Sequence, residues 1–343
     1  MSAQALVAAA QMLVADDKGL LAIDESNATC NQRFAQLGIP QTDEARRAYR
    51  ELIVTTVGLG ESISGIILYD ETIRQGTKNG KPFIAVLAEA GIAVGIKADT
   101  GAKELARHPG EKVTEGLDSL RDRLNEYRQM GALFAKWRAV ITLGNDIPTS
   151  GCIEANAHAL ARYAALCQEA GLVPVVETEV LMAGDHSLEF SRVATEVALL
   201  TVFRHLHIQR VLLEGMILKT NMILPGLSNP AQVPVDAVAD ETLSTLRRVV
   251  PAAVAGIAFL SGGQAPELAS ARLNAMSIRS KAVGSGVPWS LAFSFARALQ
   301  EPALDIWRGE AEKVMMAQQA LYGRARLNRL ARRGEYSDAM EAA

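Results

Sequence analysis

The apolar runs of this sequence end in charged residues, at positions where a core-facing strand is normally apolar. These residues are Asp24, Lys97, Lys136, Arg138, Glu177, Glu179 and Lys219. The two-residue period of a strand places Lys136 and Arg138 on one face, and Glu177 and Glu179 likewise. A buried charge is costly unless it has a partner. A structural ion pair explains any single one of them equally well, but the whole set indicates acid–base and Schiff-base chemistry.

Lys219 is the candidate nucleophile, because a lysine amine attacks a carbonyl only when it is neutral. Its apolar neighbour Leu218 and a nearby ammonium group, that of Lys136, would both favour the neutral amine. Glu177 could then transfer protons while the carbinolamine forms and dehydrates. We expect the shared environment to keep one of the two glutamates, Glu177 or Glu179, titrating closer to neutral pH.

The segment FLSGGQ (259–264) has the composition of a phosphate site. Ser261 supplies a hydroxyl, and Gly262 allows backbone N–H groups to approach an anion closely at the start of a following helix. Arg297, just after the last apolar run, could add a positive charge. A simple turn is the alternative explanation for the two glycines.

A second phosphate site is predicted near Asp24. Ser26, Thr29 and Arg33 follow Asp24 closely, and Lys97 could join them from another strand end. The alternative role for Ser26 or Thr29 is that of a helix N-cap.

Eight apolar runs alternate with amphipathic segments along the chain. The runs cover residues 19–23, 64–69, 93–97, 133–138, 173–177, 211–218, 256–261 and 288–294. The amphipathic segments cover residues 43–56, 117–130, 154–170, 188–205, 240–249 and 265–276. Alternating strands and helices imply a parallel sheet. Eight repeats predict an α/β fold of the (β/α)8 (TIM) barrel type, with the site at the C-terminal strand ends; an open doubly wound sheet is the alternative.

Length and composition fit one large core, since the chain has 343 residues of which 49% are hydrophobic. We expect a single domain over residues 1–343, with an N-terminal helix and C-terminal covering helices and tail. The arginine-rich part of 304–333 is interpreted as a solvated helix end rather than a basic patch. Its arginines are Arg324, Arg326, Arg329, Arg332 and Arg333.

Charge and cysteine content exclude several classes of protein. A formal net charge of −3 gives no overall attraction to nucleic acid or to an anionic membrane. Three cysteines without a CxxC pair favour reduced thiols in a cytoplasmic enzyme over a disulfide framework. The first residues lack the positive region of a signal peptide, and no run approaches the length of a membrane span.

Motifs along nearly the whole chain resemble those of class I fructose-bisphosphate aldolases. The matching segments are KGLLAIDES (18–26), VGIKAD (94–99), FAKWR (134–138), VPVVETE (173–179), LEGMILKTNM (213–222), FLSGGQ (259–264), LNAM (273–276) and WSLAFSFARALQ (289–300). DESNATC (24–30), with its alanine, is similar to the plastid and bacterial branch. The resemblance implies the barrel fold, a place in glycolysis and gluconeogenesis or the Calvin cycle, no cofactor or metal, and a homotetramer.

The resemblance also implies roles for individual residues. Lys219 matches the Schiff-base lysine and Glu177 the general acid–base. The family has acidic and basic groups that act on the C3 and C4 hydroxyls and the scissile bond, and these correspond to Asp24, Lys136 and Glu179. Arg138 belongs to the same charged cluster. The phosphate on the dihydroxyacetone side would meet Ser261, Gly262 and Arg297, and the other phosphate would meet Ser26, Thr29, Arg33 and Lys97.

Several positions depart from the family pattern. Thr178 and Thr220 replace prolines, and Ala296 replaces a glycine of the animal enzymes. Animal and plant members end in a tyrosine that assists proton exchange on the enamine, whereas this sequence has Tyr336 near its end and no terminal tyrosine. Tyr336, another residue or water would then perform that step.

Three alternative functions stay open at this stage. A metal-dependent aldolase would need a histidine cluster, and none of the five histidines ends a predicted strand. A non-catalytic sugar-phosphate binder or scaffold would keep the phosphate sites but would have no use for the catalytic lysines and carboxylates. Sedoheptulose bisphosphate is a second candidate substrate.

Overall fold

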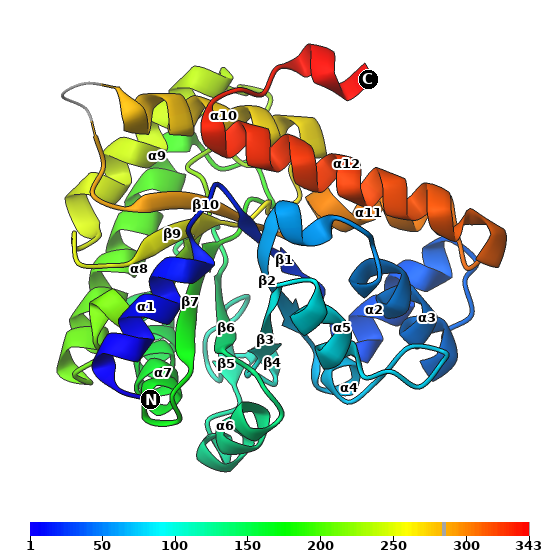
Figure 1. The fold of residues 1–343 in the computed structure, drawn as a ribbon. Helices are drawn as coiled ribbons and strands as arrows, with labels where there is room; N and C mark the ends of the chain where they lie inside the picture. Colours follow the sequence, from blue (N-terminus) through cyan, green and yellow to red (C-terminus); the bar gives the residue numbers. More distant parts are fainter. Residues whose placement is uncertain (283–285, 343) are drawn as a thin grey trace.

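Eight parallel strands close into a barrel in the computed structural model, which describes residues 1–282 and 286–342 (Figure 1). The barrel strands are β1 (Gly19–Ala22), β2 (Ile63–Leu68), β3 (Ala93–Lys97), β6 (Phe134–Ile141), β7 (Val173–Val180), β8 (Ile217–Thr220), β9 (Gly256–Phe259) and β10 (Ser290–Phe295). Their order around the barrel is β1-β10-β9-β8-β7-β6-β3-β2. The (β/α)8 barrel prediction is therefore confirmed, and the open doubly wound sheet is excluded.

Each predicted run overlaps a barrel strand, but several bounds were wrong. The run 211–218 begins with the 3-10 helix η2 (Leu213–Gly215), and β8 starts only at Ile217. An antiparallel hairpin of β4 (Gly101–Glu104) and β5 (Lys112–Glu115) was not predicted. The hairpin escapes a search for apolar runs because its residues are mostly polar.

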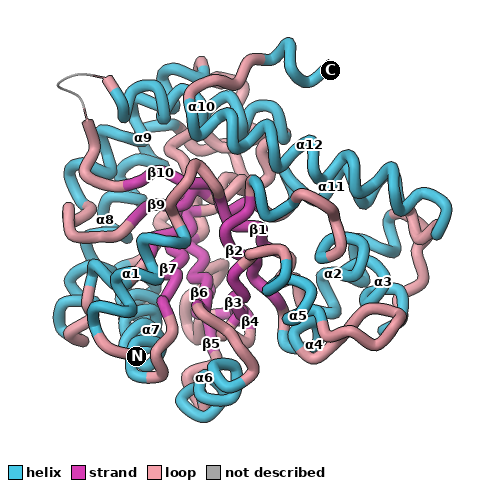
Figure 2. Tube along the Cα trace, in the orientation of Figure 1, coloured by secondary structure: helices cyan, strands magenta, loops and turns pink. Residues whose placement is uncertain are grey.

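Helices surround the strands, as the cyan tubes around the magenta barrel show in Figure 2. They are α1 (Ala3–Leu13), α2 (Asn27–Gln36), α3 (Asp43–Val54), α4 (Asp70–Ile73), α5 (Phe83–Glu89), α6 (Leu120–Gln129), α7 (Ser150–Glu169), α8 (Leu188–Ile208), α9 (Val235–Val249), α10 (Pro266–Lys281), α11 (Arg297–Trp307) and α12 (Val314–Arg333). Shorter 3-10 turns are η1 (Leu59–Glu61), η3 (Ala311–Lys313) and η4 (Asp338–Ala342). None of these helices is long and apolar enough to cross a membrane.

Apolar side chains fill the barrel below its C-terminal end. Phe134 occupies the interior of the barrel. Its ring fits there because Gly95 has no side chain, and a Cβ at Gly95 would lie 2.2 Å from the Phe134 ring. Leu6, Ala10 and Leu13 of α1 pack into the same cluster. Helix α1 therefore closes the N-terminal end of the barrel, and the polar site is confined to the C-terminal end.

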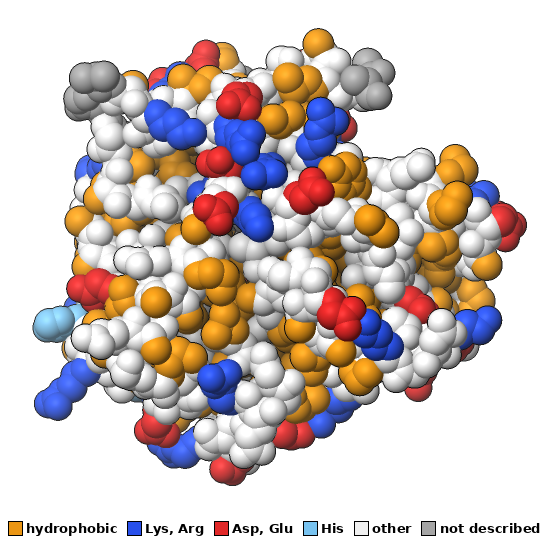
Figure 3. Space-filling view, viewed as in Figure 1, with side chains coloured by type: hydrophobic (Ala, Val, Ile, Leu, Met, Phe, Trp, Pro, Cys, Tyr) orange, Lys and Arg blue, Asp and Glu red, His pale blue; other side chains and the backbone are white. Residues whose placement is uncertain are grey.

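The interpretation of the C-terminal arginines as a solvated helix end is wrong for two of them. Arg324 is buried and makes a bidentate ion pair with Glu341. Arg332 is buried and donates to the carbonyl oxygens of Val14 and Lys18, which ties α12 to the turn between α1 and β1. Figure 3 shows acidic and basic side chains intermixed on this face of the molecule. Arg333 at the end of α12 pairs with Asp17 at 3.0 Å.

Candidate active site

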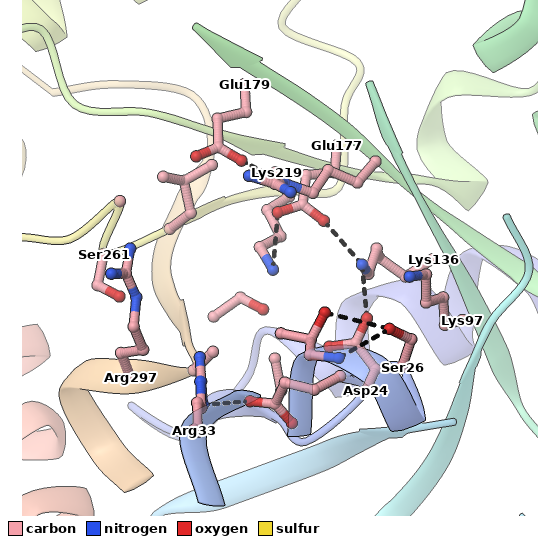
Figure 4. A pocket seen from close by; sticks show the side chains of 18 of the residues that line it. Asp24, Ser26, Arg33, Lys97, Lys136, Glu177, Glu179, Lys219, Ser261 and Arg297 are labelled. Atoms are coloured by element: carbon pink, nitrogen blue, oxygen red, sulfur yellow. Dashed lines mark hydrogen bonds and ion pairs between the residues drawn. The ribbon is translucent and has the colours of Figure 1, made fainter. Parts of the chain in front are cut away.

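A cavity of about 480 Å³ opens at the C-terminal ends of the barrel strands. Every residue that the sequence analysis proposed for the site lines it (Figure 4). They are Asp24, Ser26, Thr29, Arg33, Lys97, Lys136, Arg138, Glu177, Glu179, Lys219, Ser261, Gly262 and Arg297. Closure of the barrel therefore brings together residues from both ends of the chain.

Two lysines and two carboxylates form a continuous chain of contacts in the cavity (Figure 4). The Lys219 Nζ atom lies 3.1 Å from Oε1 of Glu177, and the Lys136 Nζ atom lies 3.2 Å from Oε2 of the same carboxylate. Lys136 also lies 2.6 Å from Oδ2 of Asp24. All four side chains are buried, so these contacts are the main source of charge compensation for the group.

This arrangement decides the charge states of the carboxylates. Burial alone would raise the pKa of Glu177, but the ammonium groups of Lys136 and Lys219 outweigh burial and hold that pKa below its ordinary value. The expectation that one of the two glutamates titrates closer to neutral pH is therefore wrong for Glu177. Burial also raises the pKa of Asp24, but the charges of Lys136, Lys219 and Lys97 lower it by more. The pKa of Asp24 is therefore below its ordinary value. Conversely, Asp24 and Glu177 outweigh burial and raise the pKa of Lys136.

Strand register explains why these side chains meet. Glu177 of β7 lies opposite Lys219 of β8 in the parallel ladder, and Arg138 of β6 lies opposite Glu177. Strands β6 and β7 extend to Ile141 and Val180, beyond the ends of their neighbours, and so carry Arg138 and Glu179 further into the mouth. There Arg138 Nε donates to Oε2 of Glu179.

A glycine loop between β9 and α10 forms one wall of the cavity. Gly262 has φ +61°, and a Cβ at this position would lie 2.4 Å from the sulfur of Met182. Gly263 has φ +93°, and a Cβ there would lie 3.0 Å from Nη2 of Arg297. Glycine is thus required in this loop, both by its backbone and by the close approach of Met182 and the Arg297 guanidinium.

The opposite wall comes from α2 and the end of β3. Ser26 is the N-cap of α2, with its Oγ accepting from the Thr29 N–H at 3.3 Å. The predicted capping role is thus present, and the same serine also lines the cavity. Lys97 Nζ lies 3.4 Å from Oδ1 of Asp99, a buried carboxylate.

Sequence reasoning missed Glu25 in the cavity wall. Its carboxylate accepts from Arg33 at 2.7 Å, from Arg50 at 2.9 Å and from the side-chain amide of Gln300 at 2.9 Å. A two-residue period continued through this segment would put Glu25 on the face opposite Asp24. Strand β1 ends at Ala22, however, so the period no longer applies to these two residues.

Other lining residues were also missed. They are Ala22, Gln32, Gln36, Leu260, Ser294, Ala296 and Glu301. Gln32 lies three residues after Thr29 on α2, and Gln36 lies three residues after Arg33, so the helical period of α2 was the signal that could have found them. Tyr336, by contrast, is not among the lining residues; it is buried and its hydroxyl donates to Oε1 of Glu341 at 2.7 Å.

Comparisons with known proteins agree with this geometry. The family described as fructose-bisphosphate aldolase class-I matches residues 5–343. A protein of Xanthomonas campestris named "Probable fructose-bisphosphate aldolase class 1" is 52% identical over 98% of this chain and 99% of its own length. "Fructose-bisphosphate aldolase 4, cytosolic" of Arabidopsis thaliana is 46% identical over 96% of this chain and 83% of its own.

A solved structure has the same fold. It is the fructose-bisphosphate aldolase of Plasmodium falciparum, crystallised in a ternary complex with TRAP and a small-molecule inhibitor. Its TM-score with this chain is 0.94, with 42% sequence identity over 97% of this chain and 95% of the other.

The fold and the cavity define a (β/α)8-barrel enzyme with a buried lysine–carboxylate cluster at the strand ends. Together with the full-length matches, they place the chain in the class I fructose-bisphosphate aldolase family. Its activity is that of a class I fructose-bisphosphate aldolase, a lyase.

Proposed function

We propose that Lys219 forms a Schiff base with the C2 ketone of fructose 1,6-bisphosphate. The observation that carries this proposal is the contact of Lys219 Nζ with Glu177 Oε1 at 3.1 Å inside the buried cluster. A neutral Lys219 amine attacks C2, and Glu177 is placed to move the protons that convert the carbinolamine into the imine, with loss of water.

The protonated imine then accepts the electron pair of the C3–C4 bond. A carboxylate of the cluster removes the C4 hydroxyl proton, the C3–C4 bond breaks, and glyceraldehyde 3-phosphate leaves. The electron pair forms an enamine, which takes a proton at C3, and hydrolysis releases dihydroxyacetone phosphate and regenerates Lys219. Asp24, Lys136 and Glu179 are placed to contact the C3 and C4 hydroxyls, since all three line the same cavity.

The phosphates anchor the two ends of the sugar. Ser261, Gly262 and Arg297 take the phosphate on the dihydroxyacetone side, and Ser26, Thr29, Arg33 and Lys97 take the other one. Both groups line the cavity and bring hydroxyls or cations to it. Sedoheptulose 1,7-bisphosphate, with the same ketose phosphate end, is a second substrate of the same chemistry.

We also propose a cytoplasmic homotetramer. An apolar row on α8 supports association, because Val193, Val197 and Leu200 recur at helical spacing and are each at least 40% exposed. Light scattering on the purified enzyme tests this, and a monomeric mass at micromolar concentration would contradict it.

Borohydride reduction in the presence of substrate tests the mechanism. We expect mass spectrometry to find the reduced sugar-phosphate adduct on Lys219, and Lys219→Ala to abolish both the adduct and turnover. Lys78→Ala, which removes an exposed lysine, serves as the control and should retain both. An active enzyme with unmodified Lys219 would contradict the proposal.

A coupled assay separates the remaining alternatives. Turnover of each bisphosphate with EDTA present is expected from Schiff-base chemistry, whereas a metal-dependent aldolase would lose activity. Binding of the bisphosphate without turnover would instead favour a scaffold protein.

A further inference from the structure

Arg272, in the middle of α10, is buried without a carboxylate partner. It is 4% exposed, and its Nη1 donates to Oε1 of Gln264 at 2.7 Å. Within the described part of the chain it makes no ion pair, and its Nε has no hydrogen-bond partner. Arg46, Arg50 and Arg324, which are also buried, each pair with a glutamate. Buried Arg332 has no such pair, but both of its Nη atoms donate to backbone carbonyl oxygens.

An uncompensated guanidinium is costly to bury. Burial lowers the pKa of Arg272, and no acidic group opposes that effect. An arginine still carries its charge at neutral pH. A positive charge therefore lies inside the protein, and in the ligand-free state no anion balances it.

Gln264 connects this charge to the glycine loop of the cavity. The buried Gln264 side chain donates from Nε2 to the carbonyl oxygen of Ser261 at 2.9 Å, and its backbone N–H donates to the same oxygen at 3.0 Å. In a trans peptide the N–H points away from the carbonyl oxygen. Fixing the Ser261 carbonyl toward Gln264 therefore turns the Gly262 N–H toward the side that lines the cavity.

We propose that Arg272 is a positioning residue for the phosphate on the dihydroxyacetone side. It holds Gln264, which orients the peptide between Ser261 and Gly262, and its buried charge is balanced only when the phosphate dianion binds. Charges inside a protein are screened weakly, so this attraction acts across the intervening amide and loop. The inference rests on the proposed phosphate role of Ser261 and Gly262.

Arg272→Met tests the charge with a side chain of similar length. We expect the ligand-free variant to melt at the same or a higher temperature, because the uncompensated charge is gone. We expect the stabilisation by inorganic phosphate to fall and KM to rise about tenfold (~1.4 kcal/mol), with kcat retained. A purely structural role predicts the opposite, namely lower thermal stability and an unchanged phosphate effect, and that result would overturn the inference.

Two substrates identify which phosphate Arg272 serves. Fructose 1-phosphate has only the phosphate on the dihydroxyacetone side, so Arg272→Met should raise KM for it and for fructose 1,6-bisphosphate by the same factor. A rise confined to the bisphosphate would assign Arg272 to the other end and refute the proposal.

Two further variants keep the test decisive. Arg272→Lys retains the charge, so its phosphate affinity should lie within about threefold of wild type. A loss of affinity as large as that of Arg272→Met would exclude a role for the charge. If Arg272→Met does not fold, the Arg272→Lys variant alone tests the proposal. Arg279→Met, on the same helix, removes an arginine paired with Asp236 and Asp240 and should leave KM unchanged. Borohydride labelling of wild-type Lys219 shows independently whether the proposed function itself holds.

Discussion

The ammonium group of Lys136 lies 2.6 Å from the carboxylate of Asp24, across the mouth of the barrel. Lys136 belongs to β6, and Asp24 follows β1; in the barrel order β3 and β2 lie between these strands. The pair therefore forms only when the sheet curves enough to bring these two strands to face each other. The same ion pair belongs to the charged cluster of the cavity and links two distant strands of the barrel, so changes to it should alter both stability and chemistry.

Lys136→Met should destabilise the enzyme most at neutral pH. Lys136 is the partner of two buried carboxylates, Asp24 and Glu177, whose pKa values are lowered in the folded state. A carboxyl group of this kind binds more protons when unfolded, so its contribution is present above the unfolded pKa and is lost as pH falls below about 4.5. Without Lys136, burial favours the protonated carboxyls instead.

The predicted loss of unfolding free energy is about 3 kcal/mol near neutrality, because two carboxylates lose a buried partner. The difference from wild type should shrink as pH falls toward the ordinary carboxyl range. Urea unfolding at a series of pH values measures it, with Lys78→Met as the surface control. A difference that does not depend on pH would contradict the ion-pair account.

Gly262→Ala should weaken substrate binding through the backbone. The residue has φ +61°, and the added Cβ would lie 2.4 Å from the Met182 sulfur. We expect a loss of about 1–3 kcal/mol in stability from the strained conformation and at least a tenfold rise in KM, in steady-state assays. Gly323→Ala, in α12 with open space around it, is the matched control and should gain about 0.5–1 kcal/mol. Unchanged KM in Gly262→Ala would exclude the loop from phosphate binding.

Glu25→Gln should distinguish the two ends of the substrate. Glu25 holds Arg33 at 2.7 Å and Arg50 at 2.9 Å, and neutralising it leaves the buried Arg50 without its carboxylate. We expect a stability loss of about 3 kcal/mol. Because we propose that Arg33 binds the phosphate that fructose 1-phosphate lacks, kcat/KM should fall more for the bisphosphate than for the monophosphate. Equal losses for both substrates would place Arg33 elsewhere.

Tyr336→Phe should affect stability and leave proton exchange intact. The Tyr336 hydroxyl donates to Glu341 at 2.7 Å and is not among the groups that line the cavity. Losing this hydrogen bond should cost about 1 kcal/mol in thermal or urea unfolding. The rate at which the enamine exchanges its proton with solvent, followed by isotope incorporation into dihydroxyacetone phosphate, should stay within about twofold of wild type. A large fall in that rate would show that the tail moves to the cavity.

Much of the fold and site was predictable from the sequence, because barrel strands have a local signature. Each is a short apolar run, and its period assigns residues such as Lys136 and Glu177 to one face without knowledge of the partner strands. Parallel strands also place all their C-terminal ends on one side. The convergence of Asp24, Lys136 and Lys219 thus followed from local pattern and fold class together.

Only the tertiary structure decided which charges compensate which. Charge state depends on distances between side chains from different strands, so the lowered pKa of Glu177 could not be inferred from its own segment. For the same reason, the place of Glu25 in the cavity wall and the burial of Arg324 could not be predicted. Glu25 contacts residues of three helices, and Arg324 is buried against the tail. Sequence patterns determined the elements and the types of residue at their ends; the closed barrel determined burial and partners, because both depend on contacts between distant parts of the chain.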